Sequence, residues 1–256
     1  MLLTKQNDIP FLVFKNLSET GIVKHCFSTR KGGVSTGHFA SMNLGYGRGD
    51  DDSNVDENFR MICEATGISS DKIVKSKQKH GINILKIDGL IEVPDNTDGL
   101  MTNRSGIILV TFYADCVPLL FCDPVKRIIA NSHAGWRGVV QNMPAETVKM
   151  MSLHYGSDPK DILVGLGPCI SKECFEVDED VALQFKKEFS ECVYNGKSGK
   201  YYIALQEACK LSLLRANIPL QNIELANWCT FSNDELFFSH RRDGALRGSL
   251  AAFIEL

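Results

Sequence analysis

Two histidines and one cysteine stand at turns, where a buried core would not select polar residues. His80 precedes Gly81, Cys116 follows Asp115, and His133 begins a glycine-containing segment with the sequence HAGWRG. Imidazole and thiolate groups are common zinc ligands, and three protein ligands leave one coordination position open for water, as in catalytic zinc sites. Their wide spacing along the chain differs from the compact spacing of structural zinc sites. These residue types therefore predict a catalytic metal site that the fold must assemble.

A second chemistry uses the same residues without a metal. Cys116 can act as a nucleophile with His133 as its base, and backbone N–H groups near Gly135 and Gly138 can stabilise an oxyanion. The protein would then be a thiol hydrolase, and His80 would at most orient other groups. A third interpretation is structural, with Cys116 as a small buried thiol and the histidines as hydrogen-bonding turn residues. The residues alone leave these alternatives open.

Three short apolar runs must position these side chains within the stretch from Asp98 to Val140. The runs are too short for helices, are rich in β-branched residues and end at turn residues, so they predict buried strands. They cover Ile107–Tyr113, Val117–Cys122 and Arg127–Asn131. We therefore expect Cys116 and His133 at the ends of adjacent strands.

The remaining chain indicates a mixed α/β protein. A Gly- and Ser-rich segment from Ser28 to Asp51 is too long for a plain connection, which favours a functional loop. Ser53 is a suitable N-cap for an amphipathic helix that ends at Gly67. Further strands are expected at Leu236–Ser239 and Leu250–Ile254. Several connections are too short for parallel crossovers, so we predict mixed sheets with helices packed outside them.

Length and composition restrict the class of protein. The 256 residues contain no linker or composition shift, so one domain over residues 1–256 is expected. A formal net charge of −3 gives no electrostatic reason to bind nucleic acid or an anionic membrane, and no apolar run is long enough to span a bilayer. Nine cysteines without disulfide-framework spacing, and an N-terminus without a signal-peptide pattern, favour the cytoplasm.

Short motifs that follow one another along the whole chain identify a family. They are STRKGGVS from Ser28, MNLG from Met42, QKHG from Gln78, DGL from Asp98, ADC from Ala114, HAGWRG from His133, GPC from Gly167 and FFSHRR from Phe237. With these motifs the chain resembles the laccase-domain proteins. That family was once described as multicopper polyphenol oxidases and is now regarded as purine nucleoside phosphorylases with adenosine deaminase activity.

The resemblance implies a single-domain α/β/β sandwich with mixed sheets, as in the cysteine–histidine toxin and YfiH-like superfamily. It implies that His80, Cys116 and His133 bind zinc and carry the catalysis, with copper also reported for the family. Implied substrates are adenosine, inosine, guanosine and methylthioadenosine, with phosphate as co-substrate. Some bacterial members are instead described as peptidoglycan editing factors, which remove wrongly incorporated serine from a muropeptide precursor. Six histidines, two of them well placed, argue against a multicopper oxidase.

Substrate contacts are expected from polar residues in the loops. Arg48 and Arg137 are candidate phosphate ligands, and Asn43 is a candidate contact for the ribose or the base. A zinc-bound water can attack C6 of adenine, as in other zinc deaminases with histidine and cysteine ligands. The expected partners are a small nucleoside and phosphate, and the sequence gives no indication of the oligomeric state.

Overall fold

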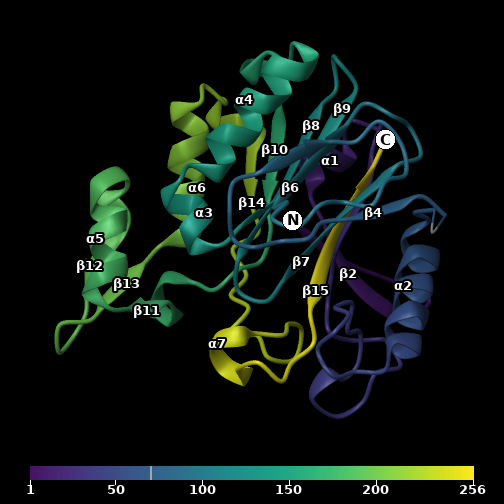
Figure 1. Ribbon diagram of the computed structural model, residues 1–256, viewed down its shortest axis with the longest axis horizontal. Coiled ribbons are helices and arrows are strands. Elements are labelled where there is room, and N and C mark those ends of the chain that lie inside the picture. The colour runs from purple at the N-terminus through teal and green to yellow at the C-terminus, as the bar shows by residue number, and fades with distance from the viewer. Residues whose placement is uncertain (70) are drawn as a thin grey trace.

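Two six-stranded sheets that lie face to face form the centre of the molecule in a computed structural model, which describes residues 1–69 and 71–256 (Figure 1). The first sheet runs, in spatial order, through β1 (Leu2–Gln6), β2 (Ile9–Val13), β3 (Lys24–Ser28), β15 (Leu250–Glu255), β7 (Ile108–Tyr113) and β4 (Ile73–Lys75). The second runs through β14 (Ile223–Leu225), β10 (Leu163–Leu166), β8 (Val117–Asp123), β9 (Ile128–Ala134), β6 (Gly99–Thr102) and β5 (Ile84–Lys86).

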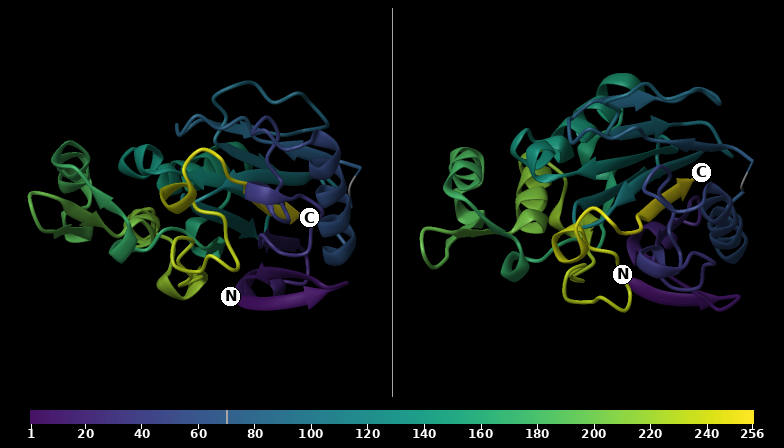
Figure 2. Two further views of the ribbon diagram at one scale, coloured as in Figure 1. Left: turned by 90° about the horizontal axis from the view of Figure 1, so that it is seen from below. Right: turned by 60° about the horizontal axis from the view of Figure 1, so that its bottom comes forward.

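A smaller sheet and the helices complete the fold. The third sheet consists of β11 (Glu176–Val177), β13 (Tyr201–Ile203) and β12 (Val193–Asn195). The helices are α1 (Lys15–Ser18), α2 (Asp52–Thr66), α3 (Trp136–Val140), α4 (Met143–Tyr155), α5 (Glu179–Glu188), α6 (Leu205–Arg215) and α7 (His240–Asp243). Short 3-10 turns lie at Gly37–Phe39, Pro159–Asp161, Lys172–Cys174, Ser190–Cys192 and Leu220–Asn222. Figure 2 shows the third sheet and α5 projecting as a lobe beyond the two large sheets.

Both large sheets are mixed, as the short connections predicted. The pairs β4–β7, β5–β6 and β10–β14 are parallel, and the other pairs in these two sheets are antiparallel. The chain also leaves one sheet and enters the other several times, for example between β4 and β5 and between β7 and β8.

None of the helices in the part of the chain described here combines the length and apolarity needed to cross a membrane.

The residues of strand β8 are buried on both faces of the second sheet, so apolar and polar residues do not alternate along it. Val117, Leu119 and Phe121 pack in the cluster that includes α4 and α6, on the outer face of the second sheet. Leu120 and Cys122 point the other way, into the cluster between the two sheets. Because successive side chains of a strand face opposite sides, a strand covered on both faces needs apolar residues throughout. The predicted strand is therefore confirmed, and core clusters cover both of its faces.

Helix α2 covers the outer face of the first sheet. Val55, Phe59 and Ile62 are buried in the cluster formed by this helix and the sheet. The N-cap is Asp51, whose side chain accepts a hydrogen bond from the backbone N–H of Ser53 at 2.9 Å, so the prediction of Ser53 as the N-cap was wrong by two residues. An acidic N-cap is equally suitable because the first amides of a helix need acceptors. The helix ends at a left-handed glycine, as predicted.

Two other predicted strands have different outcomes. Residues 236–239 form no strand; Phe237 and Phe238 are fully buried in an irregular segment, so their apolar character reflects burial and not pairing. The final strand is confirmed as β15, and it occupies a central position in the first sheet between β3 and β7. Strand β9 is longer than predicted and extends through His133 to Ala134.

Candidate active site

The turn between β4 and β5 presents His80 to solvent at the junction of the two large sheets. The φ angle of His80 is 63°, a left-handed conformation that is uncommon for a residue with a side chain. The backbone N–H of His80 donates to Asp98 Oδ1 at 2.9 Å, and those of Lys79 and Gly81 donate to Asp98 Oδ2 at 3.0 Å each. One buried carboxylate therefore holds the whole turn in place.

Asp98 also orients His133 in β9. Its Oδ1 lies 2.9 Å from His133 Nδ1, and both side chains are buried. Because an ionised carboxylate can only accept, Nδ1 carries a proton and Nε2 is left for the site. Burial alone would raise the pKa of Asp98, but the hydrogen bonds from His133 and from the backbone of Lys79 and Gly81 outweigh it and hold the pKa below its usual range.

Cys116 lies in the short turn that connects β7 to β8. The residue before it, Asp115, has a φ of 94°, and its carboxylate accepts from Thr230 Oγ1 and from the backbone N–H of Arg241, each at 2.7 Å. The turn is thereby fixed to the segment that leads into α7. Asp115 acts here as a structural acceptor beside the thiol.

The three side chains converge, as the metal hypothesis requires. The ligand atoms of His80, Cys116 and His133 all lie within 4.8 Å of one another, and the two imidazole rings are 4.8 Å apart between centroids, at 87°. Gly135 permits this arrangement, since a Cβ at that position would collide with the ring of His80. His80 is exposed, Cys116 is partly buried and His133 is buried, so the group can be reached from one side.

Charge within the group favours the thiolate. Burial opposes ionisation of Cys116, but the two neighbouring imidazoles outweigh it and lower the pKa of the thiol to about 6. Burial would likewise lower the pKa of His133, but the Cys116 sulfur and Asp98 outweigh it and raise the pKa of His133 to about 9. At neutral pH the metal-free pair is therefore thiolate and imidazolium. Both metal binding and nucleophilic attack require the thiolate form.

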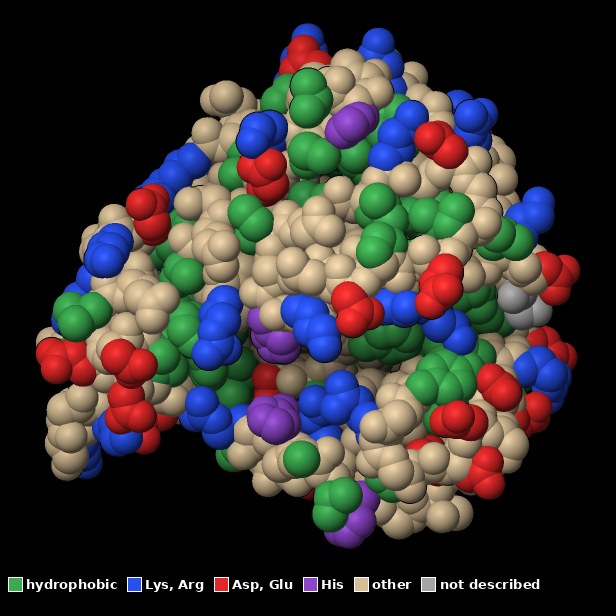
Figure 3. Space-filling model, in the orientation of Figure 1, with side chains coloured by type: hydrophobic (Ala, Val, Ile, Leu, Met, Phe, Trp, Pro, Cys, Tyr) green, Lys and Arg blue, Asp and Glu red, His purple; other side chains and the backbone are tan. Residues whose placement is uncertain are grey.

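A cavity of about 850 Å³ opens beside the three side chains. Among the described residues its lining includes a single carboxylate, that of Asp115. The lining also includes six cationic side chains: Arg48, Lys75, Lys77, Arg137, Arg241 and Arg247. Figure 3 shows basic and histidine side chains gathered around a hollow in this face of the molecule. The excess of positive charge suits an anionic ligand.

The residues predicted to contact substrate lie at different depths. Arg48 and Arg137 both line the cavity, and the guanidinium of Arg137 stacks over the ring of Trp136 at 4.3 Å. Asn43 does not line it. Its side chain is fully buried, accepts from the backbone N–H groups of Gly45 and Ser249 at 2.9 Å each, and so fixes the loop that carries Arg48.

Sequence reasoning missed two polar residues of the site. Asp98 precedes a buried strand and a glycine, which is a signal for a turn acceptor, but the sequence does not tell which backbone groups it binds. Arg247 lines the cavity from the segment before β15, and its surroundings in the sequence carry no comparable signal.

Known proteins match this chain over most of its length. The model of a protein family described as multi-copper polyphenol oxidoreductase laccase matches residues 24–256. The mouse protein named purine nucleoside phosphorylase LACC1 is 35% identical over 91% of this chain, which spans about half (55%) of the mouse protein. Proteins named purine nucleoside phosphorylase YlmD from Geobacillus stearothermophilus and YfiH from Escherichia coli are 35% and 34% identical, over 89% and 91% of this chain and 88% and 94% of their own lengths.

Solved structures match the fold equally well. The crystal structure of YlmD from Geobacillus stearothermophilus superposes with a TM-score of 0.92 at 30% identity, covering 99% of this chain and 98% of that one. A Bacillus licheniformis hypothetical protein YfiH superposes with a TM-score of 0.90 at 31% identity, covering 97% and 96%. The mixed α/β fold with three sheets is therefore the fold of these structures.

Proposed function

Because the chain belongs to the laccase-domain family of YfiH- and YlmD-like proteins, a family of purine nucleoside phosphorylases, we propose that it is a zinc-dependent enzyme of this kind. It cleaves adenosine, inosine, guanosine and methylthioadenosine with phosphate, and it also deaminates adenosine. The observation that carries the proposal is the convergence of His80, Cys116 and His133 at the edge of a cationic cavity. The proposal includes one domain over residues 1–256, the α/β/β sandwich class and a cytoplasmic location.

The donor set fits zinc. Two imidazoles and a thiolate are the ligands of several catalytic zinc sites, and the spacing of up to 4.8 Å exceeds two metal–ligand bonds only slightly. A bound zinc would supply a Lewis acid that lowers the pKa of a water molecule at the open position. Copper is the second candidate metal. Among the described residues, these three side chains are the one group of histidine, cysteine or acidic residues that could hold a metal ion. The group contains two histidines, and a multicopper centre needs more.

The protein's own side chains hold the reactants in this proposal. Asp98 keeps His133 in one orientation, and Cys116 enters the site already ionised. Arg48 and Arg137 hold phosphate, and Asn43 acts on the substrate through the loop that it fixes. In phosphorolysis a phosphate oxygen attacks the ribose C1′ as its bond to the purine breaks, so positioning of phosphate is the main contribution of the arginines.

Phosphate-dependent release of free base tests this function. Zinc-loaded protein is incubated with the four nucleosides, with and without phosphate, and free base, ribose 1-phosphate and inosine are measured. We expect base release that requires phosphate and is lost in His80→Ala. The matched control is His38→Ala, which removes an exposed histidine outside the cavity lining. Absence of base release from all four nucleosides would refute the phosphorylase.

The second candidate function is a Cys–His amidohydrolase that acts as a peptidoglycan editing factor on a muropeptide precursor. The observation in its favour is the order Asp98, His133, Cys116, which places a carboxylate behind a base and a base beside a thiol. In this case a chelator leaves activity intact and a slow amide substrate forms an adduct on Cys116. In the zinc enzyme a chelator inactivates reversibly, zinc slows alkylation of Cys116, and no adduct forms.

A further inference from the structure

Arg247 is an unusual arginine within the cavity. Its side chain is only 8% exposed, yet Nε has no hydrogen-bond partner. Nη1 donates to the backbone oxygen of Gly248 at 2.8 Å and lies 3.4 Å from Ser249 Oγ, and none of the described carboxylates forms an ion pair with this guanidinium. A buried donor without a partner is costly, so the guanidinium is held ready for an acceptor that enters the cavity.

Arg48 lies beside Arg247 although the two are far apart in sequence. Asn43 and Ser249 join their segments: Leu44 N donates to Ser249 O at 3.0 Å, and Ser249 N donates to Asn43 Oδ1 at 2.9 Å. Gly45 allows this approach, because a Cβ there would lie 2.6 Å from Ser249 Oγ. The loop that carries Arg48 and the segment that carries Arg247 are thus fixed to each other.

The two guanidinium groups repel each other. Burial and, to a smaller extent, the nearby charge of Arg48 lower the pKa of Arg247 to about 10, although Asp115 and Cys116 act in the opposite direction. Asp115 offsets this repulsion through its charge, but both of its oxygens already accept hydrogen bonds, from Thr230 and from the backbone of Arg241, and it forms no ion pair with either arginine in the described part of the chain. An anion between the arginines would remove the repulsion and supply the acceptor that Nε lacks.

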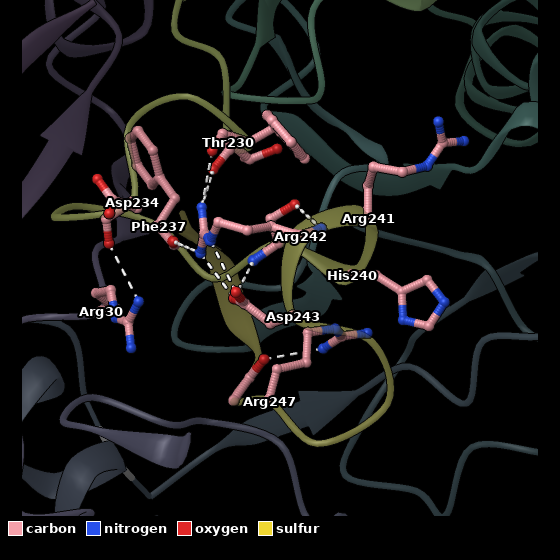
Figure 4. A network of polar contacts seen from close by, with 12 residues as sticks. Arg30, Thr230, Asp234, Phe237, His240, Arg241, Arg242, Asp243 and Arg247 are labelled. Carbon is pink, nitrogen blue, oxygen red and sulfur yellow. Dashed lines mark hydrogen bonds and ion pairs between the residues drawn. The ribbon is translucent and has the colours of Figure 1, made fainter. Parts of the chain in front are cut away.

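The other arginines near the cavity already have partners. The guanidinium of Arg242 donates to the backbone oxygens of Thr230 at 3.1 Å and Phe237 at 2.8 Å and pairs with Asp243 at 2.7 Å, which makes it structural (Figure 4). Arg241 extends away from this network and donates to the backbone oxygen of residue 176 at 2.8 Å. Arg137 stacks on a tryptophan ring at the cavity wall. Among the described arginines of the lining, Arg48 and Arg247 Nε therefore have neither a hydrogen-bond acceptor nor an aromatic ring as partner.

We propose that Arg247 and Arg48 together form a subsite for a tetrahedral oxyanion, and that its occupant is inorganic phosphate. This inference rests on the proposed phosphorylase function, since phosphate is the co-substrate of that reaction. The forked guanidinium can bind two oxygens of one phosphate, and the proximity of Cys116 places the subsite beside the three converging side chains. Arg247 is thus assigned as the principal phosphate ligand, with Arg48 closing the subsite from the loop.

Direct binding of inorganic phosphate to the zinc-loaded protein tests the subsite. Titration calorimetry and 31P line broadening are measured for the native protein, Arg247→Gln and Arg48→Gln. The control is Arg104→Gln, which removes one exposed positive charge outside the cavity lining. We expect binding to weaken about tenfold or more in each cavity variant and to stay unchanged in the control. Arg48 lies in an exposed loop, so its variant remains informative if Arg247→Gln fails to fold.

The possible results distinguish a failure of the phosphate subsite from a failure of the proposed phosphorylase function. Unchanged phosphate binding in both cavity variants, or an equal loss in Arg104→Gln, would overturn the subsite. Binding of adenosine monophosphate through both arginines, with no binding of inorganic phosphate, would overturn the choice of occupant. Phosphate bound through both arginines without base release from any nucleoside supports the subsite and refutes the phosphorylase.

Discussion

A single carboxylate, that of Asp98, organises the candidate site. It accepts hydrogen bonds from three consecutive backbone N–H groups in the turn that carries His80, and from the ring of His133. Two of the three converging side chains are therefore positioned by one residue, before any metal arrives. Such supporting hydrogen bonds fix the tautomer and direction of a metal-binding imidazole.

Replacing Asp98 by Asn tests this role. The amide offers one acceptor oxygen instead of two and brings N–H groups against backbone N–H donors, so we expect zinc affinity to fall about 10- to 100-fold. Competition with a chromogenic chelator measures the affinity. The control is Asp123→Asn, since Asp123 is also buried and accepts from two backbone N–H groups, at 2.9 Å each, in a turn outside the cavity lining. Equal zinc affinity in both variants would contradict the role.

Gly135 gives a second test at the level of one atom. A methyl group there must displace the ring of His80, so Gly135→Ala should reduce zinc content and turnover by about tenfold or more while leaving the fold intact. The control is Gly89→Ala, because a Cβ at Gly89 meets no atom within 4 Å. Elemental analysis and base release are the measurements. Full zinc content in Gly135→Ala would show that the ring is not confined as described.

At the level of elements, the sequence predicted where strands lie better than it predicted the contacts between distant segments. The apolar run of β8 was sufficient because burial on both faces leaves a clear pattern. The extension of β9 to Ala134 was missed because Ser132 and His133 are polar, and their tertiary contacts compensate for this. The same limit applies to the site: residue types identified the three converging side chains, whereas Asp98 and Arg247 depend on contacts between distant segments.

Strand β3 contains a buried histidine with a consequence for pH stability. His25 Nε2 accepts from the backbone N–H of Phe14 at 2.8 Å, and burial lowers its pKa to about 4, against a smaller opposing effect of Glu224. Above pH 6.5 the imidazole is neutral in both states and has no effect. Between pH 6.5 and 4 the unfolded chain gains a proton that the folded chain resists, so stability falls as pH falls.

The expected size of this effect is about 2 kcal/mol at pH 5 relative to pH 7.5. Urea unfolding at the two pH values, in the native protein and in His25→Gln, measures it. Glutamine keeps an acceptor for the backbone N–H of Phe14 but does not titrate. The loss of unfolding free energy between pH 7.5 and pH 5 should therefore be smaller in the variant than in the native protein, by about 2 kcal/mol. The same pH dependence in both proteins would assign the effect to other groups.

At the level of the whole molecule, the site lies where the chain crosses between the large sheets. His80 follows the first sheet and precedes the second, and so does Cys116. Asn131 in β9 adds a direct link, since its amide donates to the backbone oxygens of Leu109 in β7 and Ala252 in β15 at 2.9 Å each. A metal held by the three side chains would therefore join the two sheets.

Metal removal should lower the melting temperature without unfolding the chain. Zinc at a thousandfold excess over its dissociation constant adds roughly 4 kcal/mol, which corresponds to about 10 °C for a protein of this size. The fold persists because Asp98 and Asn131 hold the same regions without metal. Thermal scans and near-ultraviolet circular dichroism, before and after chelation, provide the measurement. An unchanged melting temperature would show that no metal bridges the sheets.

The central place of β15 affects how the protein can be made. The strand is synthesised after all the others, yet it pairs with β3 and β7, for example through Ala252 with Phe27 and Thr111. Until it leaves the ribosome, the first sheet remains split between those partners, and part of the layer between the sheets stays uncovered. A nascent chain of this kind presents unpaired strand edges late in translation. Completion of the first sheet therefore waits for β15, and until then the unpaired edges of β3 and β7 and the apolar surface beside them favour association with other chains.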